Sequence, residues 1–207
     1  MFESDFLRKA MIAAPVILLS LTVHEFFHAW TAYRFGDTTA RDQGRLTLNP
    51  LAHLDFLGLL MMFISKFTFG WAKPVPVNAY NFKGNVRVAD FWISIAGPLS
   101  NLGLGLGFGI LFRLLRIMHL AVPEAAYSFL IYGVSINVSL AFFNLIPLFP
   151  LDGSHILRSV LPHSAGEFLD RIQPFSPIIL LVLILAGGIW LILGPFISFF
   201  VSLFAGL

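Results

Sequence analysis

The chain has 207 residues, of which 57% are hydrophobic and only 12% are charged, and its mean hydropathy is +0.85. Soluble domains carry about a quarter charged residues, so this composition excludes an ordinary soluble domain and indicates a membrane protein. The chain has no cysteine, which excludes disulfides, thiolate metal ligands and cysteine nucleophiles. A formal net charge of +2 without a basic patch gives no indication of nucleic acid as a partner.

Four apolar stretches are long enough to cross the lipid bilayer as helices, at about 6–33, 91–111, 125–149 and 177–206. About 20 apolar residues are needed for one crossing. The last stretch is longer than needed, so we predict either one tilted helix or a break near Gly187 or Gly194. The sequence therefore predicts a single integral-membrane domain over residues 1–207, of the all-α polytopic class, with about 4–6 transmembrane helices.

The region at about 51–85, between the first two predicted helices, contains no stretch that we predict to cross the membrane as a helix. The stretch Phe56–Phe69 is apolar but short, and Lys66 interrupts it, so we predict a re-entrant or interfacial segment. The following stretch, Lys73–Asn78, contains Pro74 and Pro76. Two prolines one residue apart exclude a helix there and predict a short extended, β-like stretch.

Positive charges predict how the chain is oriented in the membrane. Suppose that the first helix runs from outside to inside and that Phe56–Phe69 does not cross. The nine inner charges are then Arg34, Arg41, Arg45, Lys66, Lys73, Lys83, Arg87, Arg158 and Arg171. The four outer charges are Arg8, Lys9, Arg113 and Arg116. This excess agrees with the positive-inside rule. The size of the chain fits a multi-pass protein of a bacterial or archaeal plasma (inner) membrane.

The segment His24-Glu25-Phe26-Phe27-His28 is an HExxH motif inside an apolar predicted helix. Two histidines at i and i+4 lie on one helix face, where they can bind a single zinc ion. The glutamate between them can act as the base toward a zinc-bound water. Ionisable groups at membrane depth are energetically expensive and mark function, so we predict a hydrolytic zinc site in the membrane.

A catalytic zinc usually has three protein ligands, so a third must come from elsewhere in the chain. The best candidate is Asp152, because Pro147 and Pro150 loosen the backbone before it and Gly153 permits close backbone approach.

Membrane topology tests this pairing of the motif with a distant carboxylate. His28 lies six residues before Arg34, and Asp152 lies six residues before Arg158. Both would therefore sit roughly 9 Å inside the same membrane face. Sharing one metal requires an even number of crossings between them, which predicts that Phe56–Phe69 does not cross.

The motifs HEFFHAW, GRLTLNPLAHLDFLG, KPVPVN, AGPLSN and NLIPLFPLDGSHIL follow one another between residues 24 and 157. In this order they resemble the site-2 protease family of intramembrane zinc metalloproteases, in particular minimal prokaryotic members without PDZ or CBS domains. The resemblance implies that His24, His28 and Asp152 bind one Zn2+ per chain. It implies that Glu25 activates the attacking water and that Asn144 contacts the substrate or the developing oxyanion. The implied substrates are transmembrane proteins, cut within or near the bilayer. The count of positive charges places the active site toward the cytoplasm.

Other interpretations of these residues stay open. A membrane metal transporter or a metal-binding pseudoprotease would also place histidine and aspartate in the membrane. Asn144 could instead form an interhelical hydrogen bond, and Asn101 is expected to pack structurally. For His53 and Asp55 we favour a structural or gating role, and His155 is close enough to Asp152 for a supporting role. The sequence also leaves open whether the protein forms a homo-oligomer or binds a regulatory membrane partner.

Overall fold

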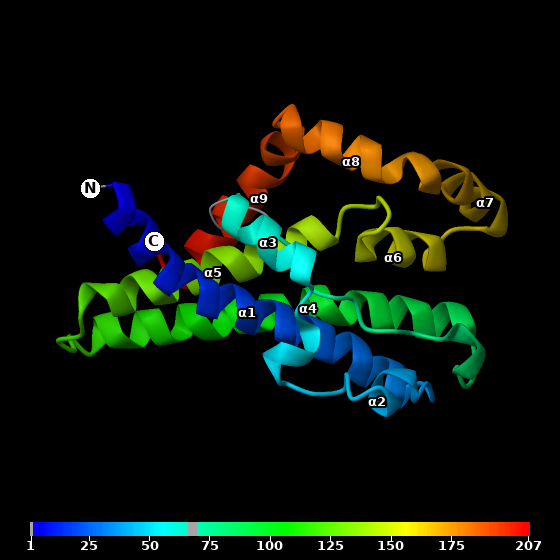
Figure 1. Cartoon of the computed structure of the whole chain (residues 1–207), viewed down its shortest axis with the longest axis horizontal. Helices are drawn as coiled ribbons and strands as arrows, with labels where there is room; N and C mark the ends of the chain where they lie inside the picture. The colour runs from blue at the N-terminus through cyan, green and yellow to red at the C-terminus, as the bar shows by residue number, and fades with distance from the viewer. Residues whose placement is uncertain (1, 66–69) are drawn as a thin grey trace.

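A computed structural model describes residues 2–65 and 70–207, which fold mostly into helices (Figure 1). Lys66 and Phe69, part of the predicted re-entrant segment, lie outside the described residues. The longer helices are α1 (Phe2–Arg34), α4 (Val86–Ile117), α5 (Glu124–Asn144) and α9 (Gly188–Ala205). The shorter ones are α2 (Thr39–Asp42), η1 (Pro50–His53), α3 (Phe56–Ile64), η2 (Ala79–Asn81), α6 (Asp152–Val160), α7 (His163–Ile172), η3 (Gln173–Phe175) and α8 (Ser176–Leu185).

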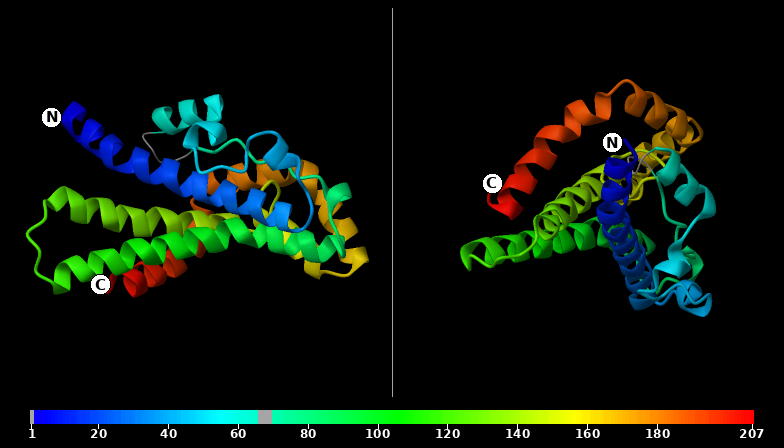
Figure 2. Two further views of the ribbon diagram at one scale, coloured as in Figure 1. Left: turned by 90° about the horizontal axis from the view of Figure 1, so that it is seen from below. Right: turned by 60° about the vertical axis from the view of Figure 1, so that its left-hand side comes forward.

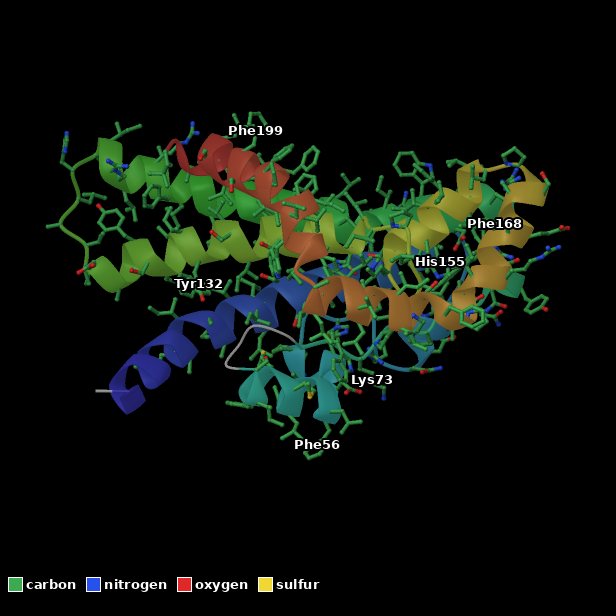
Figure 3. All side chains as sticks on the ribbon, turned by 90° about the horizontal axis from the view of Figure 1, so that it is seen from above. Phe56, Lys73, Tyr132, His155, Phe168 and Phe199 are labelled. Carbon is green, nitrogen blue, oxygen red and sulfur yellow. The ribbon has the colours of Figure 1, made fainter. Side chains whose placement is uncertain are left out.

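Within the described ranges, five helical segments are long and apolar enough to span a membrane. They are Ala10–Arg34, Val86–Ile117, Glu124–Asn144, Ser164–Leu185 and Gly188–Ala205. Large apolar side chains such as Phe56 and Phe199 point outward, 79% and 62% exposed (Figure 3). Such exposure would be costly in water but is ordinary against lipid. The chain is therefore a multi-pass, all-helical membrane protein, as its composition predicted.

Helices α4 and α5 run side by side, and α1 crosses them at an angle; the three helices form the centre of the bundle (Figure 2). Glycines allow the close approach of neighbouring helices. A Cβ atom on Gly133 would lie 2.6 Å from the Phe108 ring, so α5 is held against α4. A Cβ atom on Gly109 would lie 2.4 Å from the Phe204 carbonyl oxygen, so α9 is held against α4 as well.

Two predicted helix boundaries can be compared with the structure, and one of them changes. The stretch predicted as helix over 125–149 ends at Asn144, and residues 145–151 form turns. Pro147 and Pro150 explain this early end, because proline has no N–H for the helical ladder. The predicted break near Gly187 is confirmed: α8 ends at Leu185, and Gly187 has a φ of +72°, which favours glycine.

Helices α7, α8 and α9 connect the two ends of α4. At the beginning of α4, the Arg87 guanidinium donates to the carbonyl oxygens of Ser159 and Leu161, just before α7. Near the end of α4, Arg113 donates to the carbonyl oxygen of Leu203 in α9. The C-terminal part of the chain thus passes from one end of α4 to the other, with its bend at Gly187 (Figure 1).

The predicted re-entrant segment contains α3, a helix of nine residues. Such a helix is roughly 14 Å long, well short of the ~30 Å hydrocarbon core. Leu54 and Ala72 form an isolated antiparallel bridge on either side of it, and the Lys73 amide donates to the His53 carbonyl oxygen at 2.9 Å. The chain therefore returns to the point that it left, as expected of a segment that does not cross.

The predicted β-like stretch, Lys73–Asn78, is irregular and contributes no strand to the described residues. Arg45 holds its beginning by donating to the Lys73 carbonyl oxygen at 2.6 Å. Asp37 holds its end, because the carboxylate accepts the Asn78 amide at 2.7 Å. Burial of Asp37 raises its pKa, but hydrogen bonds from Asn78 and Thr39 outweigh this and leave the pKa below its ordinary value. Asp37 is thus a charged anchor for the stretch.

Candidate metal centre

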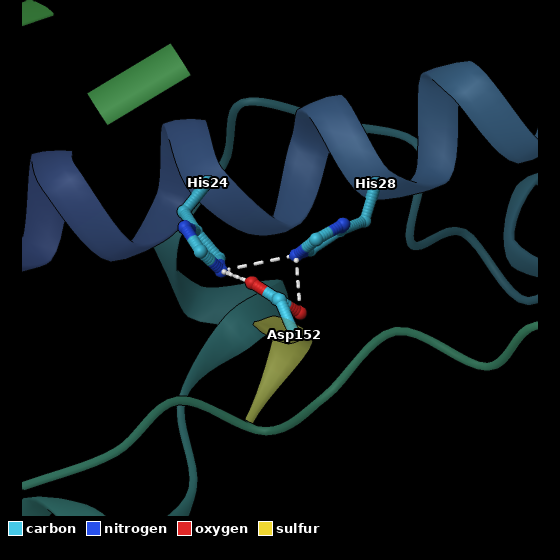
Figure 4. Close-up of side chains that lie close together, drawn as sticks. All are labelled: His24, His28 and Asp152. Carbon is cyan, nitrogen blue, oxygen red and sulfur yellow. Dashed lines mark hydrogen bonds and ion pairs between the residues drawn. The ribbon is translucent and has the colours of Figure 1, made fainter. Parts of the chain in front are cut away.

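The side chains of His24, His28 and Asp152 meet between α1 and the beginning of α6 (Figure 4). The Nε2 atom of His24 lies 3.2 Å from Oδ2 of Asp152, and that of His28 lies 3.3 Å from Oδ1. One ligand atom from each of the three residues lies within 4.8 Å of the others. The structure therefore brings the HExxH histidines and the distant aspartate into one group of possible metal ligands.

The hydrogen bonds of His24 and His28 show which nitrogen of each ring carries the proton. The Nδ1 atom of His28 lies 2.7 Å from the Ile93 carbonyl oxygen, which can only accept a hydrogen bond, so Nδ1 carries a proton. The Nδ1 atom of His24 donates to Oδ1 of Asn101 at 2.7 Å. In the neutral ring each Nε2 then has a free lone pair, which is the form that binds a metal.

This donor set fits a metal cation. The two Nε2 atoms lie 3.0 Å apart, and their lone pairs would repel each other without a positive charge close by. The Oδ2 atom of Asp152 is buried and has no hydrogen-bond partner among the described residues. Two imidazoles and one carboxylate are the ligand types of catalytic zinc sites, which leave a further position for water or substrate.

Two glycines make room for this arrangement. A Cβ atom on Gly97 of α4 would lie 2.4 Å from Nε2 of His28 and 2.6 Å from Cε1 of His24. A Cβ atom on Gly153 would lie 2.3 Å from the Leu145 carbonyl oxygen. Gly153 thus allows the close backbone approach that the sequence predicted, whereas the contact of Gly97 with both imidazoles was not predicted.

Glu25 lies beside the two histidines and is only 9% exposed. Its Oε2 atom accepts the Val75 amide at 2.8 Å. The carboxylate is therefore held between α1 and the stretch Lys73–Asn78, with its other oxygen free of any hydrogen bond recorded in the described part of the chain. This placement suits a base that acts next to a metal.

These residues line an open cavity of about 580 Å³ that lies between α1, α4, α5, α6 and the stretch 70–77, with Leu180 of α8 at its edge. Its polar and charged lining consists of His24, Glu25, His28, Asp90, Ser94, Asn144, Asp152 and His155. Its volume is in the range of ligand-binding cavities, and its apolar walls suit an apolar peptide segment.

Asn144 lies in this cavity, at the last residue of α5. Its Nδ2 atom donates to the carbonyl oxygen of Leu140, one turn earlier in the same helix, at 3.0 Å. The interhelical hydrogen bond that we considered as an alternative is not among the bonds recorded for Asn144. An amide nitrogen has two protons, so the second stays available for a ligand in the cavity.

His155 follows Asp152 on α6 and also faces the cavity (Figure 3). Its Nδ1 atom lies 3.7 Å from Oδ1 of Asp90, and Ser159 donates to the other oxygen of Asp90 at 3.2 Å. His155 therefore belongs to the wall of the site.

Two other residues from the predicted motifs lie apart from the metal group. His53 is buried, and its Nε2 atom donates to the Thr47 carbonyl oxygen at 2.8 Å. Asp55 caps the N-terminus of α3 by accepting the Gly58 amide at 2.8 Å. Both contacts hold loop backbone in place, in agreement with a structural role.

The sequence is similar to a known protein family and to several of its members. A family model described as "Peptidase family M50" matches residues 113–187, which include Asn144 and Asp152. YwhC of Bacillus subtilis, named as a candidate zinc metalloprotease, is 42% identical over 174 residues, covering 81% of this chain and 77% of its own.

More distant relatives have similar names. Rip2 of Mycobacterium tuberculosis, also named as a candidate zinc metalloprotease, is 35% identical over 173 residues, covering 82% of this chain and 64% of its own. Zinc metalloprotease MJ0392 of Methanocaldococcus jannaschii is 28% identical over 152 residues, covering 73% of this chain and 34% of its own. The chain thus spans less than two thirds of the length of these two relatives. No solved structure matches it.

Proposed function

Because the chain belongs to peptidase family M50, the zinc metalloproteases of the site-2 protease type, we propose that it cuts membrane proteins within or near their transmembrane segments. Cleavage at such a position releases a fragment from the membrane, which is the basis of regulated intramembrane proteolysis. The observation that carries the proposal is the meeting of His24, His28 and Asp152 in a cavity between helices that can span a membrane.

We propose that His24, His28 and Asp152 are the ligands of one zinc ion. The three residues would hold the ion, and as a Lewis acid it would polarise the scissile carbonyl group and lower the pKa of a bound water molecule. Glu25 accepts a proton from the attacking water and donates it to the leaving amine. The free amide proton of Asn144 donates to the negative charge that develops on the carbonyl oxygen.

The substrate class follows from the surroundings of the site. The cavity is lined by apolar residues such as Leu140, Phe143 and Leu180 as well as by the proposed ligands. A peptide bond inside a helix is protected by the helical hydrogen bonds, so the substrate must unwind locally before this bond reaches the proposed metal centre. A transmembrane segment fits these walls, and we propose that it enters the cavity as an extended segment.

Removal of zinc tests this function directly. Treatment of the purified, reconstituted protein with a zinc chelator is expected to abolish cleavage of a transmembrane substrate, because the remaining groups cannot polarise the carbonyl group. Stoichiometric zinc should restore cleavage, measured by gel analysis of a labelled substrate in liposomes. Cleavage that continues with no zinc bound would refute the metal mechanism.

A metal transporter is the alternative function. Transporters need several ionisable sites along a path through the membrane. Within the ranges that the structure describes, His24, His28 and Asp152 form the one group of three or more histidine, aspartate or glutamate side chains close enough to hold a metal ion. A single group of this kind favours a catalytic metal over a transported one.

We propose that the protein lies in the plasma (inner) membrane with its active site toward the cytoplasm, as a single domain over residues 1–207. The positive charges between α1 and α4 support this orientation. The chain has no cysteine, so single cysteines can report it. A membrane-impermeant maleimide added outside intact cells is expected to label Ala121→Cys and not Gln43→Cys, two exposed loop positions. The reverse labelling pattern would refute the orientation.

A further inference from the structure

Two fully buried asparagines lie behind the proposed metal centre, Asn101 on α4 and Asn137 on α5. Oδ1 of Asn101 accepts Nδ1 of His24 at 2.7 Å. Nδ2 of Asn101 donates to the Ser20 carbonyl oxygen at 3.1 Å and to Oδ1 of Asn137 at 3.0 Å. Nδ2 of Asn137 donates to the Gly133 carbonyl oxygen at 2.8 Å. The two amides thus connect α1, α4 and α5 to a proposed zinc ligand.

The two backbone carbonyl groups, of Ser20 and Gly133, fix the direction of every hydrogen bond formed by Asn101 and Asn137. Backbone carbonyl groups only accept, so the atoms that face Ser20 and Gly133 must be the amide nitrogens of Asn101 and Asn137. The Asn101 oxygen must then face His24 and accept a proton from Nδ1. This leaves the lone pair of His24 on Nε2, where Asp152 and His28 meet it.

The two histidines differ in how they are held. The Nδ1 proton of His28 is bound by the backbone carbonyl group of Ile93, which no side-chain substitution removes. The Nδ1 proton of His24 is bound only by a side chain, that of Asn101. The proposed metal centre therefore has one ligand whose orientation a single substitution can release.

We propose that Asn101 and Asn137 form an amide relay that positions His24 and thereby sets the affinity of the site for zinc. Asn101 is a positioning residue that fixes the tautomer and the ring direction of His24, and Asn137 fixes the amide of Asn101. The inference rests on the proposed role of His24 as a zinc ligand. Groups that hold metal-binding histidines in this way typically change metal affinity about 10–100-fold when removed.

The chemistry of the surroundings explains why position 101 carries an amide. A carboxylate at position 101 would accept from His24 but would repel the Ser20 carbonyl oxygen and Oδ1 of Asn137. Leucine fills a similar volume but neither accepts nor donates. His24 would then either keep a buried Nδ1–H without a partner or move this proton to Nε2, where it would occupy the lone pair that binds a metal. Only a group that accepts on one side and donates twice on the other satisfies all three neighbours.

The experiment compares zinc affinity with the stability of the zinc-free protein. Zinc dissociation constants are measured by chelator competition on the purified full-length protein for Asn101→Leu, Asn137→Leu and Ser20→Ala. We expect affinity to fall about 10–100-fold for Asn101→Leu and by a smaller factor for Asn137→Leu, since Asn101 then still donates to Ser20. Ser20→Ala is the matched control, because its buried hydroxyl bonds only to Val16, one turn earlier, and it should keep the wild-type affinity.

Thermal unfolding, measured with and without zinc, separates the positioning of His24 from a simple loss of packing. The relay predicts that zinc raises the melting temperature of Asn101→Leu less than that of the wild type. An unchanged zinc dissociation constant in folded Asn101→Leu would overturn the relay, whatever happens to the melting temperature. If Asn101→Leu does not fold, Asn137→Leu decides by the same criterion.

His24→Ala distinguishes failure of the relay from failure of the proposed function. If His24→Ala leaves the zinc dissociation constant of the protein unchanged, the proposed metal centre is wrong and the relay falls with it. If His24→Ala abolishes zinc binding and Asn101→Leu does not weaken it, the metal centre stands and the relay alone is refuted.

Discussion

Replacement of Glu25 by glutamine is expected to lower peptide cleavage by roughly 10³-fold while zinc remains bound. Glutamine has the shape of glutamate, and its side-chain oxygen can still accept the Val75 amide that now bonds to Glu25 at 2.8 Å. It cannot take a proton from the attacking water, so the loss should appear in the chemical step. Single-turnover cleavage of a reconstituted transmembrane substrate measures the rate, and elemental analysis measures the zinc.

The same variant separates the protease from its alternatives. Glu124→Gln is the matched control, because Glu124 begins α5 on the exposed surface and does not line the cavity. It should cleave at the wild-type rate. If Glu25→Gln cleaves as fast as the control, Glu25 is not the base. If neither the wild type nor the control cleaves any membrane helix, and Glu25→Gln changes only metal flux, the transporter interpretation is correct.

The sequence predicts those parts of the site that follow from local spacing and from chain topology. His24 and His28 share a helix face because of their spacing, which holds for any α-helix. Asp152 is chosen from the prolines and the glycine around it, and the count of crossings places it at the same depth as His28 if Phe56–Phe69 does not cross. The pairing of Leu54 with Ala72 agrees with the segment between them not crossing. Hydropathy likewise predicts the all-helical membrane fold, because the length of an apolar stretch is compared directly with the bilayer.

Other parts of the structure depend on contacts that no local pattern encodes. The short helices α6 and α7 were not predicted, because they lie between apolar stretches and have no span-length signal of their own. Asn101 was expected only to pack, and its bond to His24 depends on how α4 crosses α1, 77 residues away along the chain. The motif AGPLSN contains both Gly97 and Asn101. A small and a polar residue four positions apart in an apolar helix was the available signal for a shared face toward α1.

The substitution Gly97→Ala is expected to have the second large effect. Alanine at this position is expected to lower zinc affinity and cleavage by at least about 10²-fold, since displacement of catalytic groups by about 1 Å has effects of that size. Its Cβ atom would lie 2.4 Å from Nε2 of His28 and 2.6 Å from Cε1 of His24, too close for any carbon atom. Both imidazoles would have to move, or α4 would have to move away from α1. Zinc affinity by chelator competition and cleavage of a reconstituted substrate measure the two losses.

Gly103→Ala is the matched control on the same helix. A Cβ atom there meets nothing within 4 Å, so the extra methyl group has room. Alanine in a helix is more favourable than glycine by about 1 kcal/mol, so Gly103→Ala should bind zinc and cleave like the wild type with unchanged or higher stability. Gly97→Ala should also fold, since the three atoms nearest to the added methyl group belong to the side chains of His24 and His28 and not to backbone. A Gly97→Ala protein that binds zinc and cleaves as Gly103→Ala does would show that the ligands do not lie against α4, and the geometry of the metal centre would then be wrong.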